Sequence, residues 1–261
     1  MIGRDFDSQE VCARLVESTK AFFSDAGFQK AVIGLSGGID SSVCAAILVQ
    51  ALGKENVTGL IMPHSGVSDK RHTDDANNLA DTLGIKTQTI LIDPFIGSFG
   101  ALPWDGSKLA DMNACSRLRA VILYHHANTH HELVCGTSNR TEMLLGYFTK
   151  YGDGAVDFEL LGGLYKGEVY GLGRHLDIAA AILETPPTAD LHPGQTDEEE
   201  IGASYEVIDA VLRQRYDDGK DEESIAAAVG EPDVVRRILA LAETNAHKCE
   251  LPRTISSGLK R

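Results

Sequence analysis

The chain has 261 residues, of which 43% are hydrophobic and 24% charged, so it can bury a sizeable core. Its formal net charge of −14 argues against a general nucleic-acid surface, which would need a basic stripe. No run of about 18 apolar residues occurs, and the N-terminus lacks a basic segment followed by an apolar one, so neither a membrane span nor a secretory signal is expected. Five cysteines without a C-x-x-C pair predict a cytoplasmic protein and no cysteine metal site.

The first half of the chain alternates helices and strands. In chain order we expect a helix at 7–23, a strand at 30–35, a helix at 39–52, a strand at 56–62, a helix at 70–83, a strand at 86–92, a helix at 110–129 and a strand at 132–135. Strands separated by helices of this length form parallel β-α-β units with right-handed crossovers. The sequence therefore predicts an α/β fold with a doubly wound, mainly parallel sheet, whose ligand sites lie at the carboxyl ends of the strands.

Beyond about residue 149 the alternation gives way to loops and helices. Residues 184–195 are rich in helix breakers and too long for an ordinary connection, which is typical of a functional or mobile loop. Acidic residues 197–200 open a predicted helix that continues to about residue 215, and more helix follows to about 244. We predict one domain over 1–261, with a core at about 25–150 and a helical C-terminal part with substrate loops at about 151–261.

A glycine-rich turn, Gly-Leu-Ser-Gly-Gly-Ile-Asp-Ser-Ser, occupies residues 34–42, where a strand becomes a helix. Its bare backbone N–H groups and the helix dipole predict an anion site suited to phosphate. It matches neither G-x-x-x-x-G-K-[ST] nor G-x-G-x-x-G. Asp40 would repel phosphate unless it holds Mg²⁺ that bridges phosphate oxygens. The alternative is a tight turn that uses Ser, Gly and Asp for conformation alone.

This turn resembles the pyrophosphate loop of the N-type ATP pyrophosphatases, which cleave ATP between the α- and β-phosphates and activate a carbonyl or carboxyl oxygen as an adenylate. Six further segments resemble the ammonia-dependent NAD synthetases of that superfamily: Gly-Thr-Ser-Asn-Arg-Thr-Glu at 136–142, Gly-Tyr-Phe-Thr-Lys-Tyr-Gly-Asp-Gly at 146–154, Leu-Tyr-Lys at 164–166, Pro-Thr-Ala-Asp-Leu at 187–191, Gly-Gln-Thr-Asp-Glu at 194–198 and Asn-Ala-His-Lys at 245–248. With the loop they extend the resemblance over residues 30–252.

The resemblance implies an adenine nucleotide alpha hydrolase-like fold and a C–N ligase. The implied reaction is the last step of NAD biosynthesis, in which ATP and ammonia convert deamido-NAD⁺ into NAD⁺, AMP and pyrophosphate through an adenylated carboxylate. Two other functions remain open: a tRNA-modifying or GMP-forming pyrophosphatase, and a non-catalytic nucleotide-binding module. The acidic balance argues against tRNA, and the paired carboxylates Asp40 and Glu142 argue against the module.

Asp40 and Glu142 each begin a helix after a strand end, so both are expected to hold one Mg²⁺; for Glu142 a helix N-terminal acid is the alternative. The expected catalytic residues are Asp40, Glu142, Lys166 and Asp153, the last as a holder of ammonium. The expected ATP contacts are Gly34, Leu35, Ser36, Gly37, Gly38, Ile39, Asp40, Ser41, Thr137, Lys166 and Thr188. The resemblance implies deamido-NAD⁺ contacts at Arg117, Lys150, Asp157, His247 and Lys248. For Lys150, Lys166 and Arg117 the alternative is a solvated surface cation. For Thr137 it is a helix cap, and for the His247–Lys248 pair a frayed tail.

The resemblance also implies a homodimer with the dinucleotide across the subunit interface. The opening helix and the helix at 110–129 are the expected contact surfaces. No room for a glutaminase is expected before the phosphate loop, so ammonia is used directly or is supplied by a separate subunit. The chain departs from the resemblance at 184–186, His192 and Cys249, where lysine, tryptophan and arginine are common, which leaves the contacts of the two lids open.

Overall fold

The computed structural model describes residues 6–188, 196–252 and 254–255. Its sheet has five strands in the order β3-β2-β1-β4-β5, and every neighbouring pair is parallel. The strands are β1 (Ala31–Gly34), β2 (Val57–Ile61), β3 (Lys86–Thr89), β4 (Leu133–Gly136) and β5 (Phe158–Glu159). The chain runs outward from β1 to β3 and then returns to β4 on the other side of β1. A parallel sheet with such a reversal opens a crevice at the carboxyl ends of the two strands beside it, here β1 and β4.

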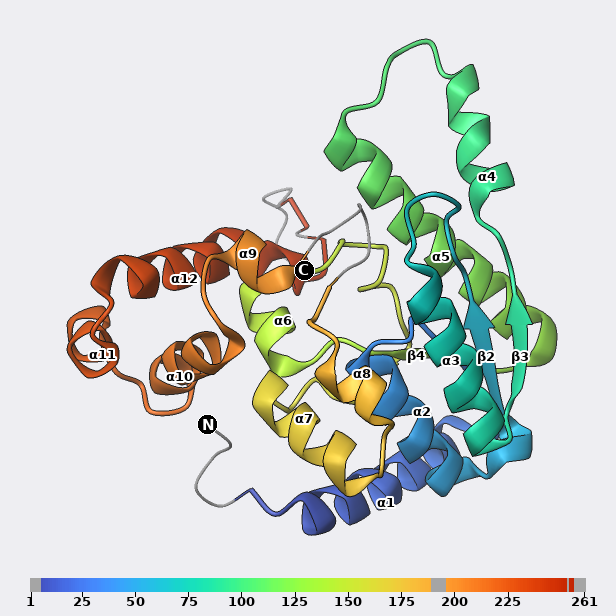
Figure 1. Ribbon diagram of the computed structural model, residues 1–261, viewed down its shortest axis with the longest axis horizontal. Helices are drawn as coiled ribbons and strands as arrows, with labels where there is room; N and C mark the ends of the chain where they lie inside the picture. The colour runs from blue at the N-terminus through green and yellow to red at the C-terminus, as the bar shows by residue number, and fades with distance from the viewer. Residues whose placement is uncertain (1–5, 189–195, 253, 256–261) are drawn as a thin grey trace, which may run out of the picture.

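Helices cover both faces of this sheet (Figure 1). They are α1 (Ser8–Ala26), α2 (Ile39–Leu52), α3 (Lys70–Leu83), α4 (Asp93–Gly97), α5 (Lys108–His130), α6 (Arg140–Leu145), α7 (Lys166–His175), α8 (Ala180–Glu184), α9 (Asp197–Ile201), α10 (Tyr205–Tyr216), α11 (Glu222–Val229) and α12 (Pro232–Asn245), with 3-10 turns at Lys54–Asn56, Ser98–Ala101 and Ala246–Lys248. Ala31 and Ile33 join one core with α1, α2, α3 and α7, whereas Val32 joins a second core against α5. Burial on both faces is what makes β1 a short, wholly apolar run.

The predicted doubly wound α/β fold is confirmed, and α2 and α3 have the predicted bounds. One prediction is wrong: the helix expected from 197 to about 215 is two helices. Gly202 ends α9 in the left-handed region at φ 82°, and the hydroxyl of Ser204 then caps α10 by accepting from the backbone N–H of Val207. Four further elements, α4, β5, α7 and α8, were not predicted.

The C-terminal helices α10, α11 and α12 enclose a third apolar core, which lies beside α6 in Figure 1. Asp209 of α10 joins this core to the sheet domain. Its carboxylate accepts from the hydroxyl of Thr141 at 2.6 Å and from the backbone N–H of Gly167 at 2.8 Å. The same Thr141 hydroxyl accepts from the backbone N–H of Lys166 at 3.0 Å. The helical part thus fixes the start of α7, and with it the position of Lys166. Over the described residues, every helix is too short or too polar to cross a membrane.

Candidate active site

The phosphate loop links β1 to α2 at the carboxyl edge of the sheet. Ser36 and Ser41 fasten it: their hydroxyls lie 3.1 Å apart, and the backbone N–H of Gly38 donates to the Ser36 hydroxyl at 3.2 Å. Gly37 adopts φ 82°, and a Cβ there would lie 2.1 Å from the backbone oxygen of His72. The turn is therefore pressed against α3 and requires glycine at position 37.

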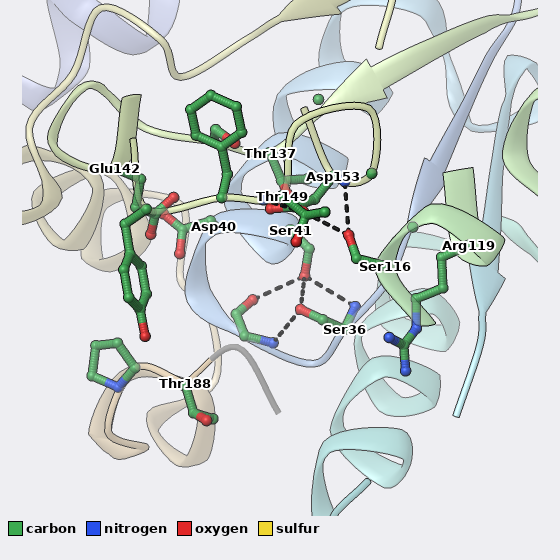
Figure 2. A pocket seen from close by; sticks show the side chains of 18 of the residues that line it. Ser36, Asp40, Ser41, Ser116, Arg119, Thr137, Glu142, Thr149, Asp153 and Thr188 are labelled. Carbon is green, nitrogen blue, oxygen red and sulfur yellow. Dashed lines mark hydrogen bonds between the residues drawn. The ribbon is translucent and has the colours of Figure 1, made fainter. Parts of the chain in front are cut away.

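The loop borders a cavity of about 460 Å³ between the carboxyl ends of β1, β2 and β4 (Figure 2). All the expected ATP contacts line this cavity except Gly37, which faces α3; those that line it are Gly34, Leu35, Ser36, Gly38, Ile39, Asp40, Ser41, Thr137, Lys166 and Thr188. The end between β2 and α5 is apolar, with Met62, Ala120 and Leu123. Glu142 and Asp153 also line the cavity, so it joins an apolar end, a set of backbone amides and a group of carboxylates.

A buried lysine sits between two carboxylates at the polar end. The ammonium of Lys166, whose side chain is only 2% exposed, lies 2.6 Å from Asp40 Oδ2 and 3.0 Å from Glu142 Oε1. It also lies 5.0 Å from the centre of the Tyr205 ring. Burial disfavours its charge, but the two carboxylates outweigh that effect and hold the pKa of Lys166 above its ordinary value. The cluster therefore keeps a permanent positive charge between Asp40 and Glu142.

One ammonium does not neutralise this corner of the cavity. Burial raises the pKa of Glu142 to about 7 in spite of the lowering effect of Lys166. Burial also raises the pKa of Asp197, which lines the same cavity. Asp197 Oδ2 accepts from the Tyr205 hydroxyl at 2.9 Å. Excess buried negative charge of this kind favours a further cation.

The donor set fits Mg²⁺, which prefers one or two carboxylates completed by water and phosphate oxygens. Asp40 and Glu142 already share one cationic group, and the phosphate loop lies beside them (Figure 2). Within the described parts of the chain, no three His, Cys, Asp or Glu side chains form a metal site by themselves. A carboxylate pair that relies on a nucleotide to complete the coordination agrees with that arrangement.

Asp153 lies across the cavity from the lysine cluster and is held by α5. Its Oδ1 accepts from the Ser116 hydroxyl at 2.6 Å and from the backbone N–H of Thr149 at 3.0 Å. Ser116 in turn accepts from the backbone N–H of Asp153 at 2.9 Å, so both the side chain and the backbone of Asp153 are held in place by Ser116. A carboxylate oriented in this way at the cavity wall is able to accept from a small cationic or N–H donor.

Of the five expected dinucleotide contacts, only Lys248 lines the cavity. Its ammonium donates to the carbonyl oxygens of Gly146 and Phe148 at 2.6 and 3.0 Å. The other four lie elsewhere. Arg117 donates to the backbone oxygen of Lys150, Lys150 donates to the backbone oxygen of His247, and Asp157 accepts from the backbone N–H of Val134.

The cavity residues that sequence reasoning missed include Asn113, Ser116, Arg119 and Asp197. On α5 the helical period carries the signal, because 113, 116, 120 and 123 share one face and Arg117 lies off it. Arg119 reaches the cavity with its Nε bonded to the backbone oxygen of Met62 at 3.0 Å. Asp197 belongs to the acidic run at 197–200, which was interpreted only as favourable charge at a helix start, so its place in the cavity was overlooked.

Glu159 of β5 is a half-buried acid beside this site. Its Oε2 accepts from the backbone N–H of Ser138 at 3.2 Å and lies where a Cβ on Gly136 would otherwise be. Burial raises the pKa of Glu159 to about 8 from its ordinary value of about 4.5. Between these two pKa values, the folded chain keeps a proton on Glu159 that the unfolded chain releases. The free energy of unfolding therefore falls as the pH rises from about 4.5 to about 8.

Glu159→Gln keeps the shape of the side chain and removes the titration. We expect its melting temperature, relative to that of the unsubstituted chain, to rise between about pH 5 and about pH 9, because only the unsubstituted chain must bury a charge at the higher pH. Thermal melts across that range provide the measurement, with the exposed Glu55→Gln as control. Parallel curves for Glu159→Gln and the unsubstituted chain would contradict the expectation.

Together, the switch-point crevice, the amide-lined loop and the carboxylate cluster define an α/β nucleotide-binding enzyme. Residues 11–252 match the family described as NAD synthase, and the chain belongs to that family of ligases, as its sequence predicted. The NH(3)-dependent NAD(+) synthetase of Archaeoglobus fulgidus is 41% identical over 249 residues, 94% of this chain and 95% of that protein. The enzyme of the same description from Methanosarcina acetivorans is 43% identical over 254 residues, 94% and 97% of the two chains.

Solved structures agree with this assignment. An NMN synthetase from Francisella tularensis is 35% identical with a TM-score of 0.85, over 96% of this chain and 99% of that one. An NH3-dependent NAD synthetase from Campylobacter jejuni, in complex with the nitrate ion, is 28% identical with a TM-score of 0.81, over 96% and 100%.

Proposed function

We propose that this chain uses ATP and ammonia to convert deamido-NAD⁺ into NAD⁺, AMP and pyrophosphate in the last step of NAD biosynthesis. The observation that supports this most directly is the single cavity that joins the phosphate loop to the Asp40–Glu142–Lys166 cluster, in a chain of the NAD synthase family. Its apolar end beside Met62 and Leu123 suits the adenine ring of ATP. Amide groups at the start of α2 suit the phosphates.

The chemistry requires a leaving group, because a carboxylate does not react with ammonia as it stands. In the proposed reaction, the nicotinate carboxylate attacks the α-phosphorus, and pyrophosphate departs toward Ser36, Gly38 and Ser41. Lys166 stabilises the negative charge that develops. Asp40 and Glu142 would hold Mg²⁺, which supplies further charge neutralisation at the departing pyrophosphate. Ammonia then attacks the adenylated carboxylate and releases AMP, so no side-chain nucleophile is needed.

Asp153 is our choice for the group that holds ammonium near the carboxylate. Its position on the cavity wall and its fixed Oδ1 support this role. Asp153→Asn is therefore expected to raise the ammonium concentration that gives half the maximal rate. An unchanged ammonium dependence would remove the assignment.

A second substrate has a specific observation in its favour. The similarity to an NMN synthetase is high, with a TM-score of 0.85 at 35% identity. Its substrate class, a mononucleotide with the same nicotinate carboxylate, requires the same activation chemistry. A shorter substrate leaves the part of the site that would receive the second nucleotide unused.

One assay tests both substrates. The chain is incubated with ATP, Mg²⁺ and either ammonium or glutamine, together with deamido-NAD⁺, nicotinate mononucleotide or xanthosine monophosphate, and AMP and amidated products are quantified. We expect one AMP for each NAD⁺ formed, ammonium as the nitrogen source, and a higher kcat/KM for deamido-NAD⁺ than for the mononucleotide. Release of ADP and orthophosphate would contradict the proposal, and the reverse preference would assign the mononucleotide.

We also propose that the protein is a homodimer. Exposed apolar side chains gather where α4, the segment after it and the first turn of α5 extend beyond the sheet in Figure 1: Leu91, Phe95, Phe99, Leu102, Trp104 and Leu109. Apolar patches of this kind favour association. The position of Arg117, Lys150 and His247 outside the cavity suits a dinucleotide shared between two copies. Sedimentation velocity of the chain and of Leu109→Glu distinguishes a dimer from a monomer.

The proposal includes a cytoplasmic location. All five cysteines are free thiols in the structure, which suits a reducing compartment. Fractionation of cells that produce the protein checks the location.

A further inference from the structure

Asn139 stands at the junction of β4 and α6, beside the two carboxylates, and its side chain is fully buried. It caps α6: its Oδ1 accepts from the backbone N–H of Glu142 at 3.0 Å. In return, the backbone N–H of Asn139 donates to Glu142 Oε2 at 3.3 Å. These two bonds form a capping box, a common device at helix starts.

A second contact is not explained by capping. Asn139 Nδ2 donates to Asp40 Oδ1 at 2.9 Å, across a separation of 99 residues in the sequence. The capping bond fixes which way the amide faces, because Glu142 N–H requires the oxygen and leaves the nitrogen for Asp40. Asn139 therefore contacts both carboxylates, one through its side chain and the other through its main chain.

In each of the two carboxylates, one oxygen is bonded to Asn139 and the other faces Lys166. The outer oxygens, Asp40 Oδ1 and Glu142 Oε2, are bonded to Asn139. The inner oxygens, Asp40 Oδ2 and Glu142 Oε1, both face the ammonium of Lys166, at 2.6 and 3.0 Å. One buried residue thus sets the rotation of both acids, so that their inner oxygens converge on the Lys166 ammonium and each oxygen keeps a lone pair for a further cation.

Residue chemistry explains why asparagine stands at 139. Serine, threonine and aspartate cap helices about as well as asparagine does. Serine and threonine lack a donor long enough to reach Asp40 while they cap, and aspartate would direct a negative oxygen at it. Only the amide combines an acceptor for the helix with a donor for the carboxylate.

We propose that Asn139 is a positioning residue that clamps Asp40 and Glu142 from behind and thereby builds the divalent-cation site. The inference depends on the proposed role of these two acids as metal ligands. Groups that orient metal-binding carboxylates contribute strongly, and their loss typically weakens metal binding or activity by about 10- to 100-fold.

Asn139→Ser tests the clamp, because serine still caps α6 and loses the bond to Asp40. Mn²⁺ is titrated into the full chain in the presence of α,β-methylene-ATP, which cannot be cleaved between its α- and β-phosphates, with the analogue alone as the blank, and free Mn²⁺ is followed by electron paramagnetic resonance. We expect affinity to fall by about 10-fold or more. In the AMP-release assay at saturating ATP, the Mg²⁺ concentration for half-maximal rate rises by a similar factor, whereas kcat at saturating Mg²⁺ changes less.

Leu145→Ala is the matched control for stability. Leu145 is fully buried on the same short helix and packs into the C-terminal core, and it takes no part in the bonds between Asn139 and the two carboxylates. It should lower the melting temperature and leave Mn²⁺ affinity unchanged. Asn139→Thr replaces the serine variant if that variant does not fold.

The outcomes separate the two hypotheses. Mn²⁺ binding by the unsubstituted chain with equal binding by Asn139→Ser overturns the clamp. Failure of both Asn139 variants to fold also overturns it, because the residue would then serve the fold first. Absence of saturable Mn²⁺ binding by the unsubstituted chain instead rejects Asp40 and Glu142 as a metal site, and with it that part of the proposed function.

Discussion

Asp40→Asn is expected to lower the rate of AMP formation by roughly three orders of magnitude, because one substitution removes two electrostatic functions. Asp40 is a proposed metal ligand, and it is also the nearest partner of the Lys166 ammonium, at 2.6 Å. The amide keeps the size of the side chain and directs no negative charge at the lysine. The rate is measured at saturating ATP and over a range of Mg²⁺, and extra Mg²⁺ is not expected to restore it.

Stability should change in the same variant. Breaking a buried ion pair by removing one partner costs about 3–5 kcal/mol, but Glu142 still faces Lys166 here. We therefore expect a smaller loss of about 2 kcal/mol, or roughly 4–8 °C in melting temperature. Asp25→Asn, an exposed change near the end of α1, is the control. Turnover of Asp40→Asn within tenfold of that control would remove both roles.

The predictable parts of the fold are those whose helices and strands are determined by residues close together in the sequence. α2 starts after the glycine turn, and α3 runs from the Asp69 cap to Gly84 in the left-handed region, so both bounds can be read from neighbouring residues. Apolar runs at β1, β2 and β4 reflect burial on both faces. The phosphate loop and its carboxylate are likewise adjacent in sequence.

The missed elements depend on distant partners. β5 is two residues long and exists through its pairing with β4. α7 contains Gly167, Gly171 and Gly173, which lower its intrinsic helix propensity. Gly173 is there for contact: a Cβ would lie 2.6 Å from Ile39 Cδ1 of α2. Packing, and not local preference, therefore stabilises this helix and presents Lys166 to the cavity.

In the candidate site, too, some features were predictable from local sequence and others depend on residues that are distant in the sequence. Residue types and spacing indicated the phosphate loop, Asp40 and Glu142, but not how the two acids are oriented. That orientation comes from Asn139 and Lys166, which meet Asp40 across 99 and 126 residues. Arg117 was expected from the resemblance alone, and the helical face of α5 shows that Arg119, and not Arg117, reaches the cavity.

Gly37→Ala is the second change with a large expected effect, because it acts on the backbone of the loop itself. A non-glycine residue at φ 82° costs roughly 1–2 kcal/mol. The new Cβ would also lie 2.1 Å from the backbone oxygen of His72, which cannot move without α3. We expect total destabilisation above about 2 kcal/mol, a melting temperature lower by roughly 4–8 °C or more, and weaker ATP binding as the loop opens.

Gly38→Ala is the matched control, one residue further along the same loop. Its φ of −86° is allowed for any residue, and a Cβ there meets only the Ser36 hydroxyl, at 3.3 Å, which has to move only slightly. Thermal melts should therefore separate the two variants, with Gly38→Ala close to the unsubstituted chain. The KM for ATP should rise more for Gly37→Ala, because only that change displaces the turn that aligns the amides. Equal melting temperatures would mean that the loop tolerates a shift of α3, and that its conformation does not depend on glycine at position 37.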